Sequence, residues 1–370
     1  MRKILLILFA CYTALLLCSC NTDKNVFYRY EYNGYLDTVG YIVVEYNTGD
    51  YNSEEVKTIL QDVEKVLFSV EEDFSISQTP YMVEKGIEKS TLMLINERSG
   101  TGVYTTVSDD FLNLLNQSID IAKRTNGLFD PSIGALTKLW NISSRAEYCM
   151  DSLVSTEYLC KIPSNDEINE ALALVNYELI EVKDNSVYLP VKNMALDFGA
   201  VGKGYACDKI AEYLNSYQFS YAIINMGGNV KFMGEALQEA DPVKLYINDP
   251  FKIGNIGYYY PNKNTGGVTS GIYERYINYQ GTKYHHLLNP HTGYPSDNEV
   301  VSVTIMGENS SISDALSTAV FMLGVEDGLK LIEEMVGYEA VIITNNQEVY
   351  VSCNLEFISE KENLKIIESR

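Results

Sequence analysis

A glycine-rich stretch over residues 196–210, LDFGAVGKGYACDKI, combines residue types that can do chemistry. Its three glycines follow a GxxGxG spacing, which differs from the dinucleotide-binding and P-loop fingerprints. Glycines at a strand-to-helix turn let backbone N–H groups approach an anion at the positive end of the helix. Lys203 could add a charge toward a phosphate, and Asp197 could accept hydrogen bonds from a ligand. A purely structural turn, with Asp197 capping its own loop and Lys203 in solvent, explains the spacing equally well.

A second group of oxygen-bearing side chains lies in residues 310–324, SSISDALSTAVFMLG. Asp314 and Thr318 are four residues apart, so a helix here would place both on one face. Such oxygen ligands suit Mg²⁺, with water and phosphate oxygens completing the coordination. Two structural alternatives stay open: the segment from Ser311 to Asp314 fits a capping box, and Thr318 could bond to the preceding helical turn.

All three histidines of the chain, His285, His286 and His291, fall within the segment YHHLLNPHTGYP. Adjacent residues of a strand point to opposite faces, so one of His285 and His286 can face a pocket while the other faces away. A zinc site needs three or four converging ligands. A zinc or heme protein built on these histidines therefore ranks last among the interpretations.

Two further motifs are rich in turn residues. In NGLFDPSIGALTKLW, residues 126–140, Phe129 and Asp130 follow an expected helix end. An Asp before a Pro usually shapes a turn, and the neighbouring aromatic ring could instead stack on a flat ligand. In NMGGNV, residues 225–230, the paired glycines indicate a tight turn after a strand.

Hydrophobic periodicity predicts helices and strands in mixed order. Helices are expected over residues 53–74 (opened by Ser53), 109–125, 166–175, 204–217, 311–323 and 326–336. Strands are expected over residues 41–46, 178–182, 186–190, 194–198, 221–225, 243–247, 272–279, 299–306 and near 339–351. Residues 78–89 are expected to form an irregular insertion. The fold class is therefore α+β, with mixed sheets and flanking helices in a single compact or bilobal body.

The N-terminus has the layout of an export signal: a short basic start, then an apolar run too short to span a membrane by itself. Its end, LCSC, resembles the bacterial lipobox. We expect a signal peptide over residues 1–19, lipidation (palmitate) at Cys20, a tether over 20–28 and a catalytic domain over 29–370. An uncleaved anchor is the alternative. Both interpretations imply an extracytoplasmic, membrane-anchored bacterial protein, held as a lipoprotein in the first.

Charge and cysteine usage narrow the functional classes further. The formal net charge of −22, from 28 basic and 50 acidic residues, makes nucleic acid a poor partner. Beyond Cys20, the cysteines show neither a CxxC pair nor a disulfide-framework spacing. A bridge between Cys149 and Cys160 is only weakly indicated.

The motifs together, in their order along the chain, resemble the ApbE-type FAD:protein FMN transferases. The resemblance covers roughly residues 36–337. It rests on NGLFDPSIGALTKLW, LDFGAVGKGYACD, NMGGN, TSGIYERY, YHHLLNPHTGYP and DALSTAVFMLG. Two positions depart from the usual DPRTG-like turn of the family, where this chain has Asn289 and His291.

The resemblance implies a role for each matching residue. Flavin or FAD contacts fall on Leu36, Leu128, Phe129, Asp130, Asp197, Lys203 and, through its backbone, Leu288. Mg²⁺ ligands fall on the Ala200 carbonyl, Asp314 and Thr318. His286 matches a functionally important histidine and is the candidate base or proton relay, so His286 and Asp314 are the expected catalytic residues.

The implied activity is Mg²⁺-dependent transfer of FMN from FAD, the substrate, to a Ser or Thr hydroxyl of an acceptor protein, with release of AMP. The acceptor would carry a short flavinylation motif. Two alternatives share the same pocket: a Mg²⁺-dependent FAD pyrophosphatase, and a flavin-binding lipoprotein without turnover. The sequence does not separate the transferase from the pyrophosphatase.

Overall fold

The structure is a computed structural model that describes residues 24–150, 160–234, 243–362 and 364–369. Within those ranges, no helix has the length and apolar character needed to cross a membrane. The expected signal peptide, Cys20 and the first residues of the tether lie outside the described residues.

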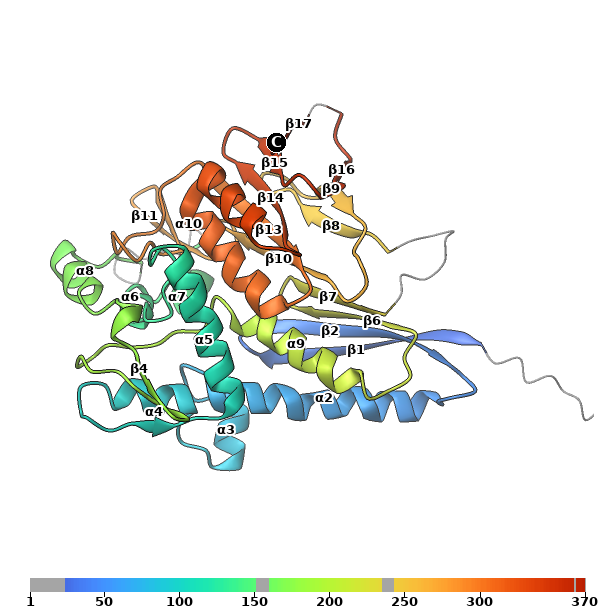
Figure 1. Cartoon of the computed structure of the whole chain (residues 1–370), viewed down its shortest axis with the longest axis horizontal. Helices are drawn as coiled ribbons and strands as arrows, with labels where there is room; N and C mark the ends of the chain where they lie inside the picture. The colour runs from blue at the N-terminus through green and yellow to red at the C-terminus, as the bar shows by residue number, and fades with distance from the viewer. Residues whose placement is uncertain (1–23, 151–159, 235–242, 363, 370) are drawn as a thin grey trace, which may run out of the picture.

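A nine-stranded sheet runs through the middle of the molecule (Figure 1). Neighbouring strands are antiparallel except for the last pair, which is parallel. In spatial order the strands are β1 (Asn25–Tyr35), β2 (Thr38–Asn47), β6 (Tyr221–Met226), β7 (Asn229–Gly234), β10 (Gly266–Gly271), β13 (Val300–Gly307), β14 (Glu339–Thr344), β15 (Glu348–Val351) and β17 (Lys365–Glu368). This order places β10 between β7 and β13: Gly266 of β10 pairs with Lys231 of β7 on one side and with Gly307, the last residue of β13, on the other.

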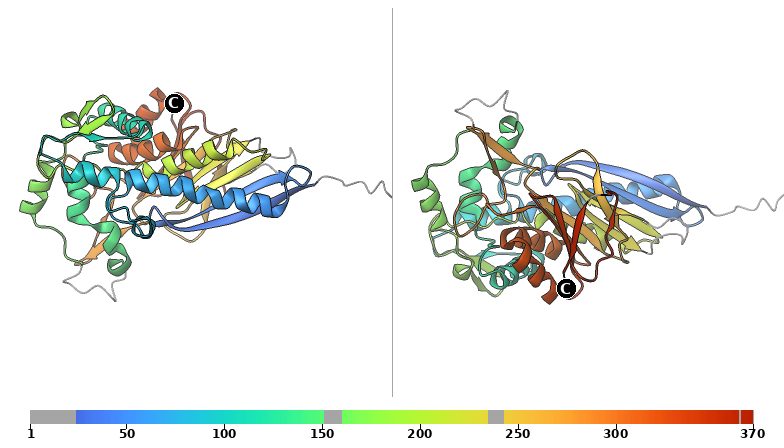
Figure 2. Two further views of the ribbon diagram at one scale, coloured as in Figure 1. Left: turned by 90° about the horizontal axis from the view of Figure 1, so that it is seen from below. Right: turned by 90° about the horizontal axis from the view of Figure 1, so that it is seen from above.

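Three long helices pack on one face of this sheet: α2 (Ser53–Phe74), α9 (Gly202–Leu214) and α10 (Ser310–Glu334) (Figures 1 and 2). A fourth, α5 (Asp109–Arg124), packs against α10. The buried apolar residues of α2 recur every three or four positions: Val56, Leu60, Val63, Leu67, Val70 and Phe74. Each such apolar side chain contributes about 1.5–3 kcal/mol when fully buried, so this stripe fixes α2 against the sheet.

The opposite face of the sheet has its own core. Alternate residues of β13 and β14 point there, because successive side chains of a strand face opposite ways. They pack beneath a small sheet of β8 (Leu245–Asn248), β9 (Asn255–Tyr259) and β16 (Ile358–Ser359).

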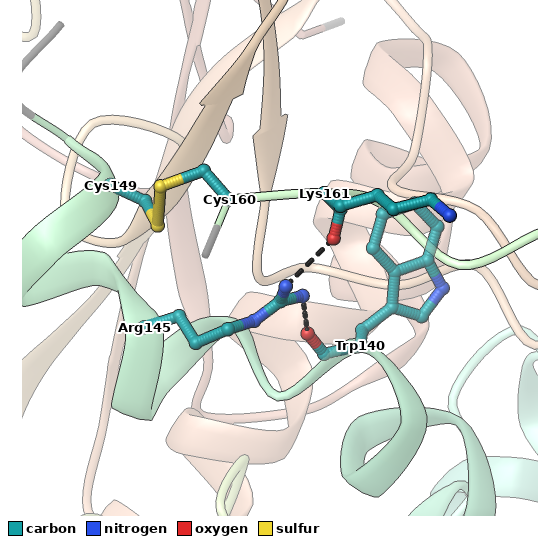
Figure 3. The surroundings of a disulfide bond; sticks show 5 residues. All are labelled: Trp140, Arg145, Cys149, Cys160 and Lys161. Carbon is teal, nitrogen blue, oxygen red and sulfur yellow. Dashed lines mark hydrogen bonds between the residues drawn. A yellow bond between two sulfur atoms is a disulfide. The ribbon is translucent and has the colours of Figure 1, made fainter. Parts of the chain in front are cut away.

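A third core joins α6 (Gly134–Trp140), α7 (Ile142–Cys149), α8 (Asn165–Leu172) and the hairpin of β11 (Tyr276–Tyr279) and β12 (Thr282–His285). A disulfide between Cys149 and Cys160 lies in this core (Figure 3). Beside it the Arg145 guanidinium donates to the carbonyls of Lys161, at 2.8 Å, and Trp140. The weakly indicated bridge is thus formed in the structure.

The remaining short elements lie around residues 80–190. They are α3 (Pro80–Lys85), α4 (Thr91–Glu97), η1 (Tyr177–Leu179) and a small sheet of β3 (Thr105–Thr106), β5 (Ser186–Tyr188) and β4 (Glu181–Lys183). The α+β class, with a large mixed sheet and flanking helices, is confirmed.

Several expected boundaries were wrong. The strand expected over 194–198 is an extended segment with a single bridge, from Ala195 to Ile133, because its neighbours are loops rather than strands. The strand expected over 272–279 is divided: β10 ends at Gly271 and β11 begins at Tyr276.

Four further differences concern turns and caps. The insertion at 78–89 contains the helical turn α3, capped by the Thr79 side chain. The two helices expected after residue 310 are one element with a kink at Gly324, whose φ is 81°. Asn52, not Ser53, caps α2. Strand β1 begins at Asn25, so part of the expected tether is sheet.

Candidate functional site

Helix α9 begins inside the glycine-rich stretch and has no capping side chain. The N–H groups of Val201 and Gly202 both donate to the Phe198 carbonyl, which forms the tight turn before the helix. Among the described residues, no donor reaches the Ala200 carbonyl. The turn therefore leaves a free carbonyl oxygen beside the positive end of a helix, where first-turn N–H groups can meet an anion.

Asp314 lies in the first turns of α10 and is 3% exposed. Its Oδ2 accepts two hydrogen bonds, from the Gly204 N–H at 2.9 Å and the Asn229 Nδ2 at 2.8 Å. No donor among the described residues reaches its other oxygen, Oδ1. Burial raises the pKa of the Asp314 carboxyl, while the charge of Lys203 and the two hydrogen bonds act to lower it.

Thr318 follows one helical turn later, half-buried. Its Oγ1 is 3.5 Å from the Ser270 Oγ, which bonds the Ser317 hydroxyl more closely, at 2.7 Å. The Ser317 hydroxyl in turn donates to the Asp314 carbonyl at 2.8 Å. The capping-box alternative for Asp314 is wrong, because Asn309 caps α10 and Asp314 points to α9 and β7.

The oxygens at this place suit a hard cation. The described residues contain no group of three or more His, Cys, Asp or Glu side chains that could hold a metal ion. The oxygens available here are instead Oδ1 of Asp314, the Ala200 carbonyl and the Thr318 hydroxyl, whose one contact among the described residues is the long one to Ser270. This donor set is of the kind that Mg²⁺ takes together with waters and phosphate oxygens.

His286 has a fixed ring orientation. Its Nδ1 donates to the Arg275 carbonyl at 3.1 Å, and its backbone N–H donates to the same oxygen. Because a carbonyl only accepts, this contact assigns the proton to Nδ1 and leaves a lone pair on Nε2. Burial, together with the charges of Lys203 and Arg275, lowers the pKa of His286 to about 4.

His285 points the other way, as the alternation along a strand requires. It is buried, its ring meets Phe321 edge-on, and its Nε2 donates to the Ser296 carbonyl at 2.9 Å. His291 lies apart, where its Nε2 contacts the Asn126 carbonyl at 3.0 Å in a cavity of about 220 Å³. The three histidines thus occupy three separate places.

Lys203 connects the parts of the site electrostatically. Its positive charge acts to lower the pKa of Asp314, of Glu274 and of His286. It forms no ion pair with any residue of the described part of the chain. A half-buried ammonium without a partner, beside a helix N-terminus, is free to neutralise an anionic ligand.

The hairpin turn between β1 and β2 is strained and held from two sides. Leu36 and Asp37 both have left-handed backbones, with φ of 51° and 52°. The Leu36 N–H donates to the Glu71 Oε1 at 3.2 Å, and Arg275 donates to the Asp37 carbonyl at 3.3 Å. Arg275 thus connects this turn, through its guanidinium, to His286, which its carbonyl holds. The contact of Leu36 with a flavin stays a prediction.

Several expected contact residues already have partners within the protein. Asp197 accepts from the Thr137 hydroxyl at 2.6 Å and the Gly199 N–H at 2.7 Å, as in the structural alternative. The Oδ1 of Asp130 accepts from the Ser132 N–H and hydroxyl, both at 2.7 Å, and its Oδ2 from the Tyr177 N–H at 3.0 Å.

The apolar members of the expected set are packed in cores. Phe129 is buried in the main core, which leaves no free ring face for stacking, and Leu128 packs against its edge. Leu288 is buried in the third core, where its backbone bridges Pro295. Their contact with a flavin stays a prediction, and it would have to use backbone atoms at Phe129 and Leu288.

Sequence reasoning missed Asn229, Glu274 and Arg275 as individual site residues. All three stand inside quoted motifs, NMGGNV and TSGIYERY, which is the signal that could have indicated them. Asn229 is 1% exposed and its amide contacts Asp314, which no local pattern shows.

The fold and the site define a class of protein in which an uncapped helix N-terminus, a lysine and a buried carboxylate can bind a phosphate group together with a cation. The ApbE family model matches residues 42–342. The chain belongs to the ApbE family.

Curated relatives and solved structures agree with this membership. The FAD:protein FMN transferase of Treponema pallidum is 30% identical over 318 residues, covering 82% of this chain and 79% of that protein. The one from Klebsiella pneumoniae (strain 342) is 32% identical over 266 residues, covering 71% and 78%. An ApbE protein structure from Thermotoga maritima has a TM-score of 0.71 at 27% identity, over 88% of this chain and 96% of that one. The flavin transferase ApbE from Vibrio cholerae has the same fold, with a TM-score of 0.70 at 21% identity over 91% and 97%.

Proposed function

We propose that this chain is an FAD:protein FMN transferase, which moves FMN from FAD to a Ser or Thr hydroxyl of an acceptor protein. The observation that carries the proposal is the buried Asp314, whose free Oδ1 lies at the crossing of α10 with the uncapped N-terminus of α9. Family membership and the names of the curated relatives support it.

The first part of the proposal is a Mg²⁺ site formed by Asp314, the Ala200 carbonyl and the Thr318 hydroxyl. Mg²⁺ bound there would neutralise charge on the pyrophosphate. The Gly204 and Asn229 hydrogen bonds to Oδ2 hold the carboxylate so that only Oδ1 is free to bind a cation. Lys203 and the first-turn N–H groups of α9 would bind the phosphate oxygens.

The second part assigns the proton of the acceptor hydroxyl to His286. As the hydroxyl oxygen forms its bond to the FMN phosphorus, its proton passes to the free Nε2 of His286. The bond between that phosphorus and the bridging oxygen breaks, and AMP leaves with the electron pair. The Arg275 carbonyl holds the proton on Nδ1, so the opposite nitrogen is always the one that accepts.

The third part concerns location. We propose an extracytoplasmic lipoprotein attached to the membrane through Cys20, on the evidence of the N-terminal sequence. The Cys149–Cys160 disulfide supports this placement, because disulfides persist mainly in oxidising compartments.

The test is to incubate the chain, beginning at Asn21, with FAD and Mg²⁺, with and without a Ser/Thr-bearing acceptor domain competent for flavinylation. The intact mass of the acceptor and the amounts of free AMP and FMN are read together. An FMN-sized mass gain with matching AMP is expected. Free FMN and AMP beside an unmodified acceptor would indicate an FAD pyrophosphatase instead. Unchanged FAD that stays bound would leave only a flavin-binding protein.

A further inference from the structure

A second polar cluster lies beside the one around Asp314. Like that one, it joins helix α9, strand β7 and helix α10. At the first cluster, Gly204 of α9 and Asn229 of β7 bond Asp314 of α10. One helical turn along α9 and two residues along β7 come Asp208 and Lys231, whose side chains point the same way as those positions. Helices α9 and α10 pack side by side here (Figure 1).

Asp208 accepts three hydrogen bonds in this second cluster. Its Oδ1 accepts from the Lys231 Nζ at 2.7 Å and the Ser310 N–H at 3.0 Å, and its Oδ2 accepts from the Ser311 N–H at 2.8 Å. The two N–H groups belong to the first turn of α10, so Asp208 caps that helix from a neighbouring one.

Lys231 completes the connection from the sheet. Besides Asp208, its ammonium donates to the Glu308 carbonyl at 2.7 Å, just before α10 begins. Lys231 is only 7% exposed, so its charge depends on Asp208 for compensation. The pair therefore ties the start of α10 to both α9 and β7.

We infer that Asp208 and Lys231 are a positioning pair that sets the place of the Asp314 carboxylate and with it the affinity of the cation site. Among the described residues, neither of the two bonds Asp314, Ala200 or Thr318. They act through the first turn of α10, whose position decides whether Asp314 reaches Gly204 and Asn229 together. The inference rests on the Mg²⁺ site of the proposed function, but not on the transfer reaction.

The pair could influence cation binding through its charge or through the position of α10. These two explanations predict opposite results for the variant Lys231→Met. If the pair acted through charge alone, removing a positive charge and leaving Asp208 would strengthen cation binding. If it acts through position, α10 loses its tie to the sheet and cation binding weakens. Loss of a group that bonds a metal ligand directly typically costs about 10–100-fold in metal affinity, and this pair acts one step further out, so the lower end of that range is expected.

The experiment measures Mn²⁺ affinity of the metal-free, FAD-free protein by EPR titration, with circular dichroism to verify the fold. Lys231→Met is expected to weaken Mn²⁺ binding about tenfold or more, and Lys231→Arg to restore much of it. The matched control is Lys209→Met on α9, which removes the same charge from a partly exposed lysine that pairs with the exposed carboxylates of Asp110 and Glu212. Its Mn²⁺ affinity is expected to stay within about twofold of the unaltered protein, as for an exposed pair.

In Lys231→Met the Asp208 carboxylate is partly buried without its partner, and this unpaired charge can unfold the protein. The double variant Asp208→Asn/Lys231→Met is therefore made alongside it. This neutral pair removes the stranded charge and is expected to fold with weakened Mn²⁺ binding. Unchanged or tighter Mn²⁺ binding in a folded variant would overturn the inference, as would failure of both variants to fold, which would make the pair a folding element only. Absence of Mn²⁺ binding by the unaltered protein would remove the cation site itself. Mn²⁺ binding without FMN transfer would reject the proposed function and leave this inference standing.

Discussion

At the scale of single residues, the site depends on where each side chain directs its one free polar atom. Asp314 has one oxygen bound by Gly204 and Asn229 and the other free. His286 has one ring nitrogen bound by a carbonyl and the other carrying a lone pair. In both, the hydrogen bond on one side fixes the chemistry available on the other.

Replacing Asp314 by Ala is expected to lower the rate of FMN transfer by about 100-fold or more, because the only carboxylate of the proposed cation site is lost. Mn²⁺ binding, followed by EPR, is expected to disappear with it. The control is Asp120→Asn, which removes an exposed carboxylate of α5 that pairs with Arg124. Normal transfer by Asp314→Ala would show that the cation site lies elsewhere.

The pH dependence follows from the lowered pKa of His286. A base whose pKa is about 4 is already unprotonated at neutral pH, and loses its function only as the pH falls through that value. The transfer rate is therefore expected to show no inflection near 6.5, the ordinary histidine value, and to fall only at more acidic pH. Rates measured from about pH 3.5 to 8 check this, with circular dichroism to verify the fold at the acidic end. His286→Gln is expected to be slow throughout, and His291→Gln to follow the unaltered profile. An inflection near 6.5 that vanishes in His286→Gln would contradict the lowered pKa.

At the scale of elements, the site is the meeting point of α9, α10 and β7. The two helices approach so closely that a Cβ added to Gly204 would lie 2.1 Å from the Ser310 carbonyl oxygen. The close approach is what lets the Gly204 N–H reach Asp314, so here a glycine is required for packing rather than for a turn.

Gly204→Ala is therefore expected to push α9 and α10 apart and to destabilise the fold by about 1–3 kcal/mol, as overpacking does. Gly202→Ala is the matched control in the same helix, because a Cβ there meets nothing within 4 Å. It is expected to be neutral or stabilising by about 0.5–1 kcal/mol, the helix preference of Ala over Gly. Denaturant unfolding of the FAD-free proteins measures both. Equal stability of the two variants would mean that the helices separate at little cost.

At the scale of the whole molecule, the large sheet has a hydrophobic core on each face. A third core lies at the end of the molecule formed by α6, α7 and α8 (Figure 2). The expected compact or bilobal body corresponds to this arrangement. The third core is small, and the Cys149–Cys160 disulfide lies within it. A covalent link there adds stability where buried apolar surface is limited.

Removing the disulfide, as Cys149→Ser/Cys160→Ser, is expected to lower the free energy of unfolding by about 2–3 kcal/mol, the range for a short closed loop. A reducing agent is expected to lower the Tm of the unaltered protein to a similar extent, with no further effect on the double variant. Cys353→Ser, at an exposed free thiol, is the control. If a reducing agent leaves the Tm of the unaltered protein unchanged, the bridge is not formed in solution.

The amino-acid sequence by itself determined the class of the fold and the family, because both depend on local patterns. The spacing in α2 and α5, the glycines before α9 and the i, i+4 pair of Asp314 and Thr318 are all properties of short segments. The expected strand boundaries were wrong where pairing with a distant segment decides them, as at residues 194–198.

Only the tertiary structure decided which partners meet. The joint approach of Gly204 and Asn229 to Asp314 depends on the order of strands and the packing of two helices, which no local pattern encodes. The protonated nitrogen of His286 is likewise set by a carbonyl on another segment. Phe129, whose motif left stacking on a flat ligand open, is buried in the main core, because removing its ring from water is favourable.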